Sequence, residues 1–163
     1  MEYWDLYDAD RQPLGRTIAR GGKLADGEYY VCCEVWVIES DGRFLITKRH
    51  PDKKAGNMWE FTGGGTLAGE TTTDSAIREL FEETGIKVNK GELKLLTTYV
   101  HKNYFMDIYA VKKDISISDI RLKTDEAVDV KWATPSEIQQ LIDNGEFVYS
   151  AGVRFKMYKI MIE

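Results

Sequence analysis

The segment from residue 71 to residue 85 most constrains the fold, because its apolar and acidic residues separate onto opposite sides of a helix. Advancing about 100° per residue from Ile77 brings three residues to the same side: Leu80, Phe81 and Thr84. The same rotation gathers three carboxylates on the other side: Glu79, Glu82 and Glu83. Thr71 to Asp74 offer capping oxygens, and Gly85 is a stop signal. The sequence therefore predicts a helix with one face on a core and a carboxylate cluster on the other.

Three carboxylates at this spacing repel one another, so the helix needs a positive partner. Arg78 lies next to the cluster and Glu70 lies upstream of it, and both are available for a charge network. An oxygen-only group is also what Mg²⁺ or Mn²⁺ prefers, because hard divalent cations take carboxylate and water ligands. Taken alone, the cluster would more simply be a solvated acidic helix face, and its surroundings decide between the two interpretations.

The surroundings favour the metal site. Gly64 is followed after five residues by Glu70 and, after seven more, by the run Arg78-Glu79-Leu80-Phe81-Glu82-Glu83-Thr84-Gly85-Ile86. This arrangement matches the Nudix box at each defining position, in a loop-helix-loop setting. The chain therefore resembles the Nudix superfamily. Residues 45–49, 59–61, 126–132 and 135–137 are similar to the strands, loop and late helix that flank the box in these proteins.

The resemblance implies an α+β fold, the Nudix fold, in which a mixed β-sheet lies in an α/β/α sandwich. It also implies a metal-dependent pyrophosphohydrolase that uses Mg²⁺ or Mn²⁺. Such an enzyme cleaves a phosphoanhydride bond by water attack at phosphorus, in a nucleoside diphosphate linked to another moiety or in a related diphosphate. Carried over by position, Glu79 and Glu83 resemble the principal metal ligands and Glu82 a further ligand. Arg78 resembles the residue that orients the carboxylates by pairing with Glu70.

Other site residues are expected with alternatives left open. The box does not fix the general base. Glu126 and Asp125 are candidates from a later loop, although they could equally lie in an exposed turn before a strand, and Glu79 is the alternative from the helix. Arg49 could meet a substrate phosphate or could be a strand-end charge. Trp59 could line the pocket or could be a packing aromatic.

Two glycines of the motif are expected to be structural. Gly64 and Gly85 would allow tight backbone turns at its two ends. Thr62 stands where many members of the superfamily have a proline before the glycine pair, which is expected to change loop stiffness more than chemistry.

The rest of the chain carries strand and helix signals of a single domain over residues 1–163. A leader of residues 1–28 begins with a short strand and a turn, and residues 29–39 and 43–48 flank the Asp41-Gly42 turn as a β-hairpin. Residues 51–59 form a loop, and strands are expected at 93–100, 104–111 and 127–132. Residues 135–143 are expected to be helical. Residues 148–162 are ambiguous, and one interpretation is a helix with these apolar residues: Val153, Met157, Ile160 and Met161.

Composition restricts the partners. The chain has 22 basic and 27 acidic residues and a net charge of −5, with no long basic run, so nucleic acid is not expected as a partner. No stretch is long and apolar enough to span a membrane, and the N-terminus lacks a secretory pattern, so we expect a cytoplasmic protein. The adjacent Cys32 and Cys33 are expected to be reduced strand residues, one facing inward. The aromatic leader could cover its own sheet or pair with a second subunit in a homodimer.

Two rival functions follow from the same resemblance. The leader, from Trp4 through Arg16, is similar to that of the isopentenyl-diphosphate isomerase branch. That branch implies a cysteine just before the box and several histidines around a metal, whereas residues 58–62 contain no cysteine and the chain has two histidines. A Nudix domain that senses a nucleotide without cleaving it is the other rival, although such a domain is expected to have lost carboxylates of the box.

Overall fold

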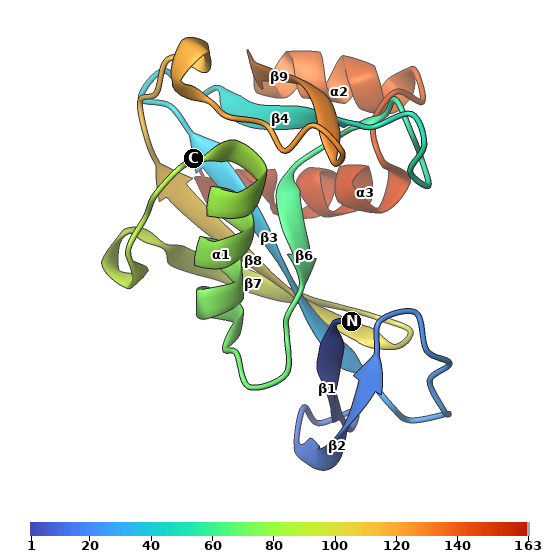
Figure 1. Ribbon diagram of the computed structural model, residues 1–163. Coiled ribbons are helices and arrows are strands. Elements are labelled where there is room, and N and C mark those ends of the chain that lie inside the picture. Colours follow the sequence, from blue (N-terminus) through green and yellow to red (C-terminus); the bar gives the residue numbers. More distant parts are fainter. Residues whose placement is uncertain (163) are drawn as a thin grey trace.

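The computed structural model describes residues 1–162 and has at its centre a mixed sheet of seven strands (Figure 1). Five strands form one hydrogen-bonded path, in the order β5 (Trp59–Glu60), β4 (Phe44–Arg49), β3 (Tyr30–Ile38), β8 (Tyr104–Lys112) and β7 (Lys94–His101). Two more strands join it off this path: β6 (Thr62–Gly65) pairs with β3, and β9 (Ala127–Ala133) pairs with β4. Strands β3 and β8 are parallel, and the other pairs are antiparallel.

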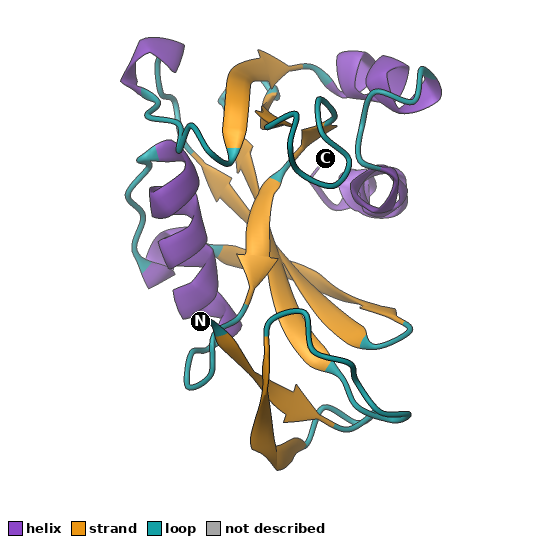
Figure 2. Cartoon of the chain, turned by 45° about the vertical axis from the view of Figure 1, so that its right-hand side comes forward, coloured by secondary structure: helices purple, strands orange, loops and turns teal. Residues whose placement is uncertain are grey.

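Helices cover both faces of this sheet. Helix α1 (Thr72–Thr84) lies on one face, and α2 (Pro135–Asp143) and α3 (Tyr149–Tyr158) lie on the other (Figure 2). Short 3-10 helices connect or end elements at η1 (Lys90–Glu92), η2 (Ile117–Asp119) and η3 (Lys159–Ile162). The predicted α/β/α sandwich with a mixed sheet is therefore confirmed. Among residues 1–162, no helix combines the length and apolar character needed to cross a membrane.

Strand β3 is buried on both faces, because its alternate side chains enter two different cores. Trp36 belongs to the core that α2 and α3 cover, whereas Val35 belongs to the core that α1 covers. Cys32 and Cys33 are free, as expected, but both are buried, not one. The expectation of a single inward cysteine was wrong because a strand covered on both faces has no solvent side.

The hairpin predicted over residues 29–48 forms only near its turn. Ile38 pairs with Phe44 beside Gly42, whose φ is 88°. Beyond that point the two strands separate: β3 continues against β6 and β8, and β4 continues against β5 and β9. Alternation and turn chemistry specify a hairpin locally, but they do not specify which strands compete for its edges. The separation creates the space in which the candidate site lies.

The leader folds as a hairpin of its own, β1 (Tyr3–Tyr7) and β2 (Pro13–Ala19), at one end of the molecule (Figure 1). The first strand and its turn were predicted, whereas β2 was not, because Pro13 and Gly15 are read as turn residues. Trp4 of β1 stacks on Tyr30 of β3 with ring centroids 4.5 Å apart. The leader thereby covers the near end of the long strand β3.

The last helices span the residues predicted from the sequence, but the C-terminal helix buries a different side from the predicted one. Helix α2 spans the predicted residues 135–143, and residues 148–162 are largely helical, in α3 and η3. The predicted apolar side of the C-terminal helix was wrong: Met157, Ile160 and Met161 are 52%, 70% and 44% exposed. The buried side instead contains Phe155 and Arg154, because Arg154 pairs with the buried Glu34 of β3, Nη2 to Oε2 at 2.6 Å.

Candidate active site

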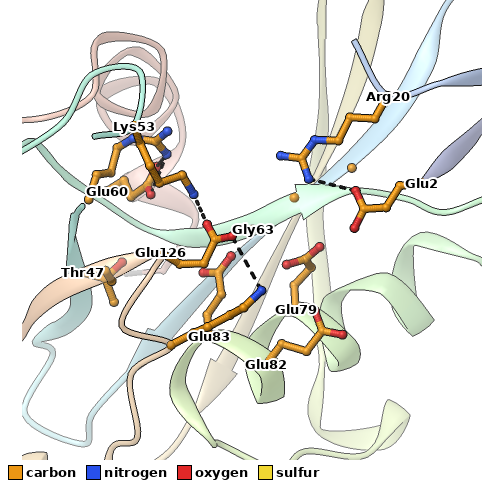
Figure 3. A pocket seen from close by; sticks show the side chains of 15 residues that line it. Glu2, Arg20, Thr47, Lys53, Glu60, Gly63, Glu79, Glu82, Glu83 and Glu126 are labelled. Carbon is orange, nitrogen blue, oxygen red and sulfur yellow. Dashed lines mark hydrogen bonds and ion pairs between the residues drawn. The ribbon is translucent and has the colours of Figure 1, made fainter. Parts of the chain in front are cut away.

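A cleft of about 230 Å³ opens between α1, β6, the end of β4 and the loop before β9 (Figure 3). Carboxylates from several elements line it: Glu2, Glu60, Glu79, Glu82, Glu83 and Glu126. Cationic side chains line it as well: Arg20, Arg49, Lys53 and Lys123. The cleft is therefore a polar pocket in which opposite charges from distant parts of the chain meet.

Helix α1 presents its carboxylates to the cleft because its ends and its buried face are fixed. The Thr71 hydroxyl accepts the N–H of Asp74 at the start (3.1 Å), and Gly85, with φ 75°, ends the helix. Leu80 and Thr84 are fully buried on the core side. Phe81 departs from the prediction, since it is 48% exposed and lies under the ammonium of Lys87. The buried stripe is narrower than the predicted one and is made instead with small residues, such as Ala76.

Arg78 is the centre of a charge network along the helix. Its guanidinium donates to both carboxylate oxygens of Glu70, at 2.7 Å from Nε and 3.1 Å from Nη2. Nη1 also donates to Glu79 (2.9 Å) and to Glu82 (3.3 Å). Hydrogen bonding to Glu70 raises the pKa of Arg78, so this side chain stays charged. The pairing of Arg78 with Glu70 expected from the sequence is present, and it holds one oxygen of Glu79 in place.

Glu79 and Glu83 face each other in the cleft. Burial raises the pKa of Glu79, against the opposing effect of Arg78. Burial also raises the pKa of Glu83 well above its usual value, and the neighbouring carboxylates of Glu79 and Glu60 raise it further. In the described part of the chain, Glu83 has no basic side chain within ion-pair distance. This carboxylate cluster therefore has more negative charge than its protein neighbours neutralise.

The two glycines of the motif have different roles. Gly85 has the predicted role, because the helix ends at this residue with a positive φ that glycine adopts readily. Gly64 does not form a turn: it lies in β6, paired with Cys33 of β3. A Cβ atom at Gly64 would lie 2.5 Å from Oε1 of Glu79. The absence of a side chain at Gly64 therefore leaves room for the Glu79 carboxylate beside the backbone of β6, which is a correction to the predicted role.

The structure places two more predicted residues in the cleft, each with an acidic or basic partner. Arg49, at the end of β4, donates from Nη1 to both oxygens of Glu60 (2.9 and 3.0 Å). Glu126 pairs with Lys53, and its second oxygen lies 3.7 Å from Nζ of Lys123. Burial raises the pKa of Glu60, which Arg49 opposes. Sequence reasoning missed Glu60 and Lys53, although Glu60 directly follows Trp59 in a segment similar to the family.

Trp59 is a packing aromatic and not a pocket-lining residue, the second of the two alternatives expected from the sequence. It is 7% exposed, belongs to the core beneath α2 and α3, and does not line the cleft. The ammonium of Lys131 lies 4.6 Å from its ring centroid on the outer side. Neighbouring residues on a strand point to opposite faces, so Glu60 faces the cleft and Trp59 faces the core.

The carboxylate cluster has the chemistry of a site for a hard divalent cation. It offers only oxygen donors, and Glu83 is partly buried without a cation of its own. Within residues 1–162, no three acidic, histidine or cysteine side chains are already gathered around one point. Arg78 draws Glu79 and Glu82 toward itself, so a bound cation would have to redirect flexible glutamate side chains. The residues fit such an ion in type and charge.

Comparison with known proteins identifies the family. The NUDIX domain family matches residues 31–151, which is most of the chain. The chain belongs to the Nudix family. An uncharacterized Nudix hydrolase of Listeria monocytogenes is 35% identical to this Nudix protein over 150 residues, covering 91% of this chain and 89% of that one. This Nudix protein is accordingly an enzyme of the pyrophosphohydrolase class.

Solved structures share the fold. The crystal structure of DR0079 from Deinococcus radiodurans superimposes with a TM-score of 0.76 at 22% identity, covering 90% of this Nudix protein and 92% of that chain. A bifunctional NMN adenylyltransferase/ADP ribose pyrophosphatase of Francisella tularensis, complexed with AMP and a Mn ion, superimposes with a TM-score of 0.65 at 22% identity. That match covers 82% of this chain and 42% of the other. Nudix proteins generally use divalent metal ions, as the Mn ion in that complex illustrates.

Three features argue against the isomerase alternative for this Nudix protein. Among residues 1–162, those that line the cleft include no cysteine and no histidine. Cys32 and Cys33 are buried, 8% and 0% exposed. Burial raises the pKa of each thiol to about 12, so neither ionises readily at neutral pH.

Proposed function

We propose that this Nudix protein hydrolyses a phosphoanhydride bond in a nucleoside diphosphate linked to another moiety, or in a related diphosphate, with Mg²⁺ or Mn²⁺. The observation that carries the proposal is the pairing of an under-neutralised carboxylate cluster, Glu79 and Glu83, with cationic side chains around the same cleft. The cluster suits the metal ions, and the cations suit the phosphate oxygens that the metal ions leave free. A small-molecule diphosphate satisfies both requirements at once.

Glu79, Glu83 and Glu82 are the proposed metal ligands. When bound, divalent ions neutralise diphosphate oxygens and lower the pKa of an attacking water. Arg78, held by Glu70, fixes the starting orientation of Glu79 through its 2.9 Å hydrogen bond. Glu82 is the most exposed of the three, with 47% of its side chain accessible, and is proposed as a further ligand.

Two carboxylates are proposed as alternative general bases. Glu126 lies on the loop before β9, at the cleft, where Lys53 and Lys123 pair with its carboxylate and orient it. Glu79 lies on α1, where burial favours its protonated form. A base must receive the proton of the water, so removal of the base is expected to lower kcat more than it changes KM. Arg49, beside Glu60, is the proposed ligand of a substrate phosphate.

The test is a panel assay of phosphate and nucleotide release from diphosphate compounds with Mg²⁺ or Mn²⁺. ADP-ribose belongs in the panel because the Francisella tularensis neighbour is named for that activity. Glu83→Gln retains the side-chain volume and removes the ligand charge, and is expected to lower activity by about a thousandfold or more. The matched control is Glu146→Gln, since Glu146 is exposed and does not line the cleft.

Each outcome decides between hydrolase and sensor. Turnover of a compound that falls in Glu83→Gln but not in Glu146→Gln supports the metal-dependent hydrolase. Binding of a compound without turnover by the unaltered protein would favour a nucleotide sensor. A cytoplasmic location, the absence of a nucleic-acid partner and a homodimer stay predictions, which fractionation and size measurements in solution would check.

A further inference from the structure

The two ends of the leader hairpin reach the mouth of the cleft. Glu2 precedes β1 and Arg20 follows β2, and the register that pairs Tyr3 with Ala19 sets them side by side. The N–H of Arg20 donates to the carbonyl oxygen of Glu2 (2.9 Å), and both residues line the cleft. Figure 3 shows them on the opposite side of the cleft from Lys53. Both lie outside residues 31–151, so the match to the NUDIX domain does not include them.

The hairpin that carries Arg20 is fixed to the wall of the cleft. The ring of Trp4 stacks on Tyr30, with centroids 4.5 Å apart. The same indole lies so close to Gly65 of β6 that a Cβ atom there would be 2.7 Å from it. The carbonyl of Tyr3 accepts the N–H of Ala68, in the loop that leads to α1, at 2.8 Å. Arg20 is therefore positioned by the same strand and loop that position the carboxylate cluster.

Arg20 is more available to an incoming anion than Arg49. Its Nη1 lies 2.8 Å from Oε2 of Glu2, in a pair whose side chains are 62% and 45% exposed. Exposed pairs of this kind contribute little to stability, so a ligand can displace Glu2. The pair of Arg49 with Glu60 is much less exposed, at 19% and 23% of the side chains, and uses both carboxylate oxygens.

The positive charge of Arg20 reaches Lys53 on the other side of the cleft. The pKa of Lys53 is lowered chiefly by burial and then by the positive charge of Arg49. Glu60 and Glu83 act in the opposite direction, and Arg20 lowers this pKa with a smaller effect than any of these. Arg20 and Lys53 therefore repel each other across the cleft. An anion between them would remove this repulsion, because it would interact favourably with both.

We propose that Arg20 binds a phosphate of the substrate, opposite Lys53, and that Glu2 holds the guanidinium at the cleft until the phosphate displaces it. This inference rests on the proposed function, because it assumes a diphosphate substrate in the same cleft. It assigns part of substrate recognition to the leader. The planar guanidinium suits the role, since it can donate two parallel hydrogen bonds to phosphate oxygens.

The first experiment measures binding, not turnover. Methylenediphosphonate, a diphosphate mimic that cannot be hydrolysed, is titrated with Mg²⁺ into the full chain by calorimetry. Arg20→Ala is expected to raise the Kd about tenfold, because charge-assisted hydrogen bonds are lost, and Arg20→Lys is expected to raise it by less. Glu2→Gln is expected to lower the Kd about threefold, since it removes the carboxylate that competes for Arg20. The control is Arg16→Ala, on the same hairpin: Arg16 is 55% exposed, pairs with Glu28 and does not line the cleft.

The second experiment uses whichever compound the panel assay identifies. Arg20→Ala is expected to raise KM about tenfold with a smaller change in kcat, whereas Arg16→Ala leaves both unchanged. Equal Kd and KM for Arg20→Ala and the unaltered protein would overturn the inference while the hydrolase proposal stands. A protein that binds methylenediphosphonate through Arg20 but cleaves no compound would retain the inference and refute hydrolysis. Failure of the unaltered protein to bind the mimic would overturn the inference as well.

Discussion

An alanine methyl group at Gly64 and one at Gly85 would meet different obstacles. At Gly64 the methyl carbon would lie 2.5 Å from Oε1 of Glu79, an oxygen that Arg78 holds by a 2.9 Å hydrogen bond. At Gly85 the nearest atom is Cβ of Arg121, at 3.3 Å, but the backbone has φ 75°, which L-residues with a side chain rarely adopt. Gly64 therefore leaves space for a carboxylate, and Gly85 allows the backbone conformation that ends the helix.

Substitution of these glycines is expected to separate activity from stability. Gly64→Ala should lower kcat/KM by about a hundredfold, because it would displace the proposed metal ligand Glu79, and displacement of such a group by an ångström has an effect of that order. Gly85→Ala should instead reduce the free energy of unfolding by about 1 to 2 kcal/mol, because alanine is strained at positive φ. Urea unfolding and steady-state kinetics of both variants check this. Equal losses of stability in the two would contradict the different roles assigned to them.

At the scale of elements, a buried carboxylate connects the leader hairpin to the rest of the protein. Asp107 of β8 is 3% exposed and accepts two hydrogen bonds from Arg11, in the turn between β1 and β2, at 2.7 and 2.6 Å. It also accepts from the hydroxyl of Thr72 in α1 (2.6 Å) and from that of Thr98 in β7 (2.7 Å). Four elements or loops therefore meet at one charged group.

This connection is expected to make stability depend on acid pH. Burial alone would raise the pKa of Asp107, but hydrogen bonds from Arg11, Thr72 and Thr98 outweigh it and lower the pKa. The stabilisation is thus fully present above the unfolded-state pKa of about 3.9 and is lost as pH falls through the lower folded-state value. Asp107→Asn should cost about 2 kcal/mol at pH 7 and weaken the acid dependence. The control, Asp10→Asn, alters an exposed residue of the same leader; similar acid dependence in both variants would contradict the argument.

Local signals were sufficient to predict helices but not strand partners. Helix α2 begins and ends where the sequence indicates, because Thr134 and Glu137 form a capping box and Pro135 opens the helix. The separation of β3 from β4 was not predictable, because it depends on β6 and β9 competing for their edges over long sequence distances. The burial of Arg154 was missed for the same reason, since its partner Glu34 is 120 residues away.

At the scale of the whole molecule, the chain gathers charge that its sequence distributes over distant segments. The motif was sufficient to locate Glu79 and Glu83, because their spacing on one helix is local. Arg20 and Glu60 came from other segments, and only the folded chain brings them to the same cleft. The cleft therefore holds carboxylates whose mutual repulsion the protein alone does not neutralise, which predicts a fold that is more stable with metal ions bound.

Thermal unfolding with and without Mn²⁺ would measure this effect. The pKa of Glu83 and that of Glu79 are raised, chiefly by burial, so the metal-free protein loses stability as pH rises from the unfolded-state value of about 4.3 toward the folded-state values. Mn²⁺ requires ionised carboxylates, so it should raise Tm more at pH 7.5 than at pH 5. Saturation at a hundred times the Kd would add about 2.7 kcal/mol.

The variant Glu83→Gln tests the effect of metal ions on stability after one proposed ligand charge has been removed. Because the variant lacks the unpaired charge, its metal-free form should have a free energy of unfolding about 1 kcal/mol greater than that of the unaltered protein. It should therefore unfold at a higher temperature, as expected where functional residues reduce stability. Its Tm should respond less to Mn²⁺, because one ligand is lost. Glu146→Gln should behave as the unaltered protein does. If Mn²⁺ raised the Tm of Glu83→Gln as much as that of the unaltered protein, Glu83 would not be a ligand, and the metal would have to be held by other carboxylates of the cleft.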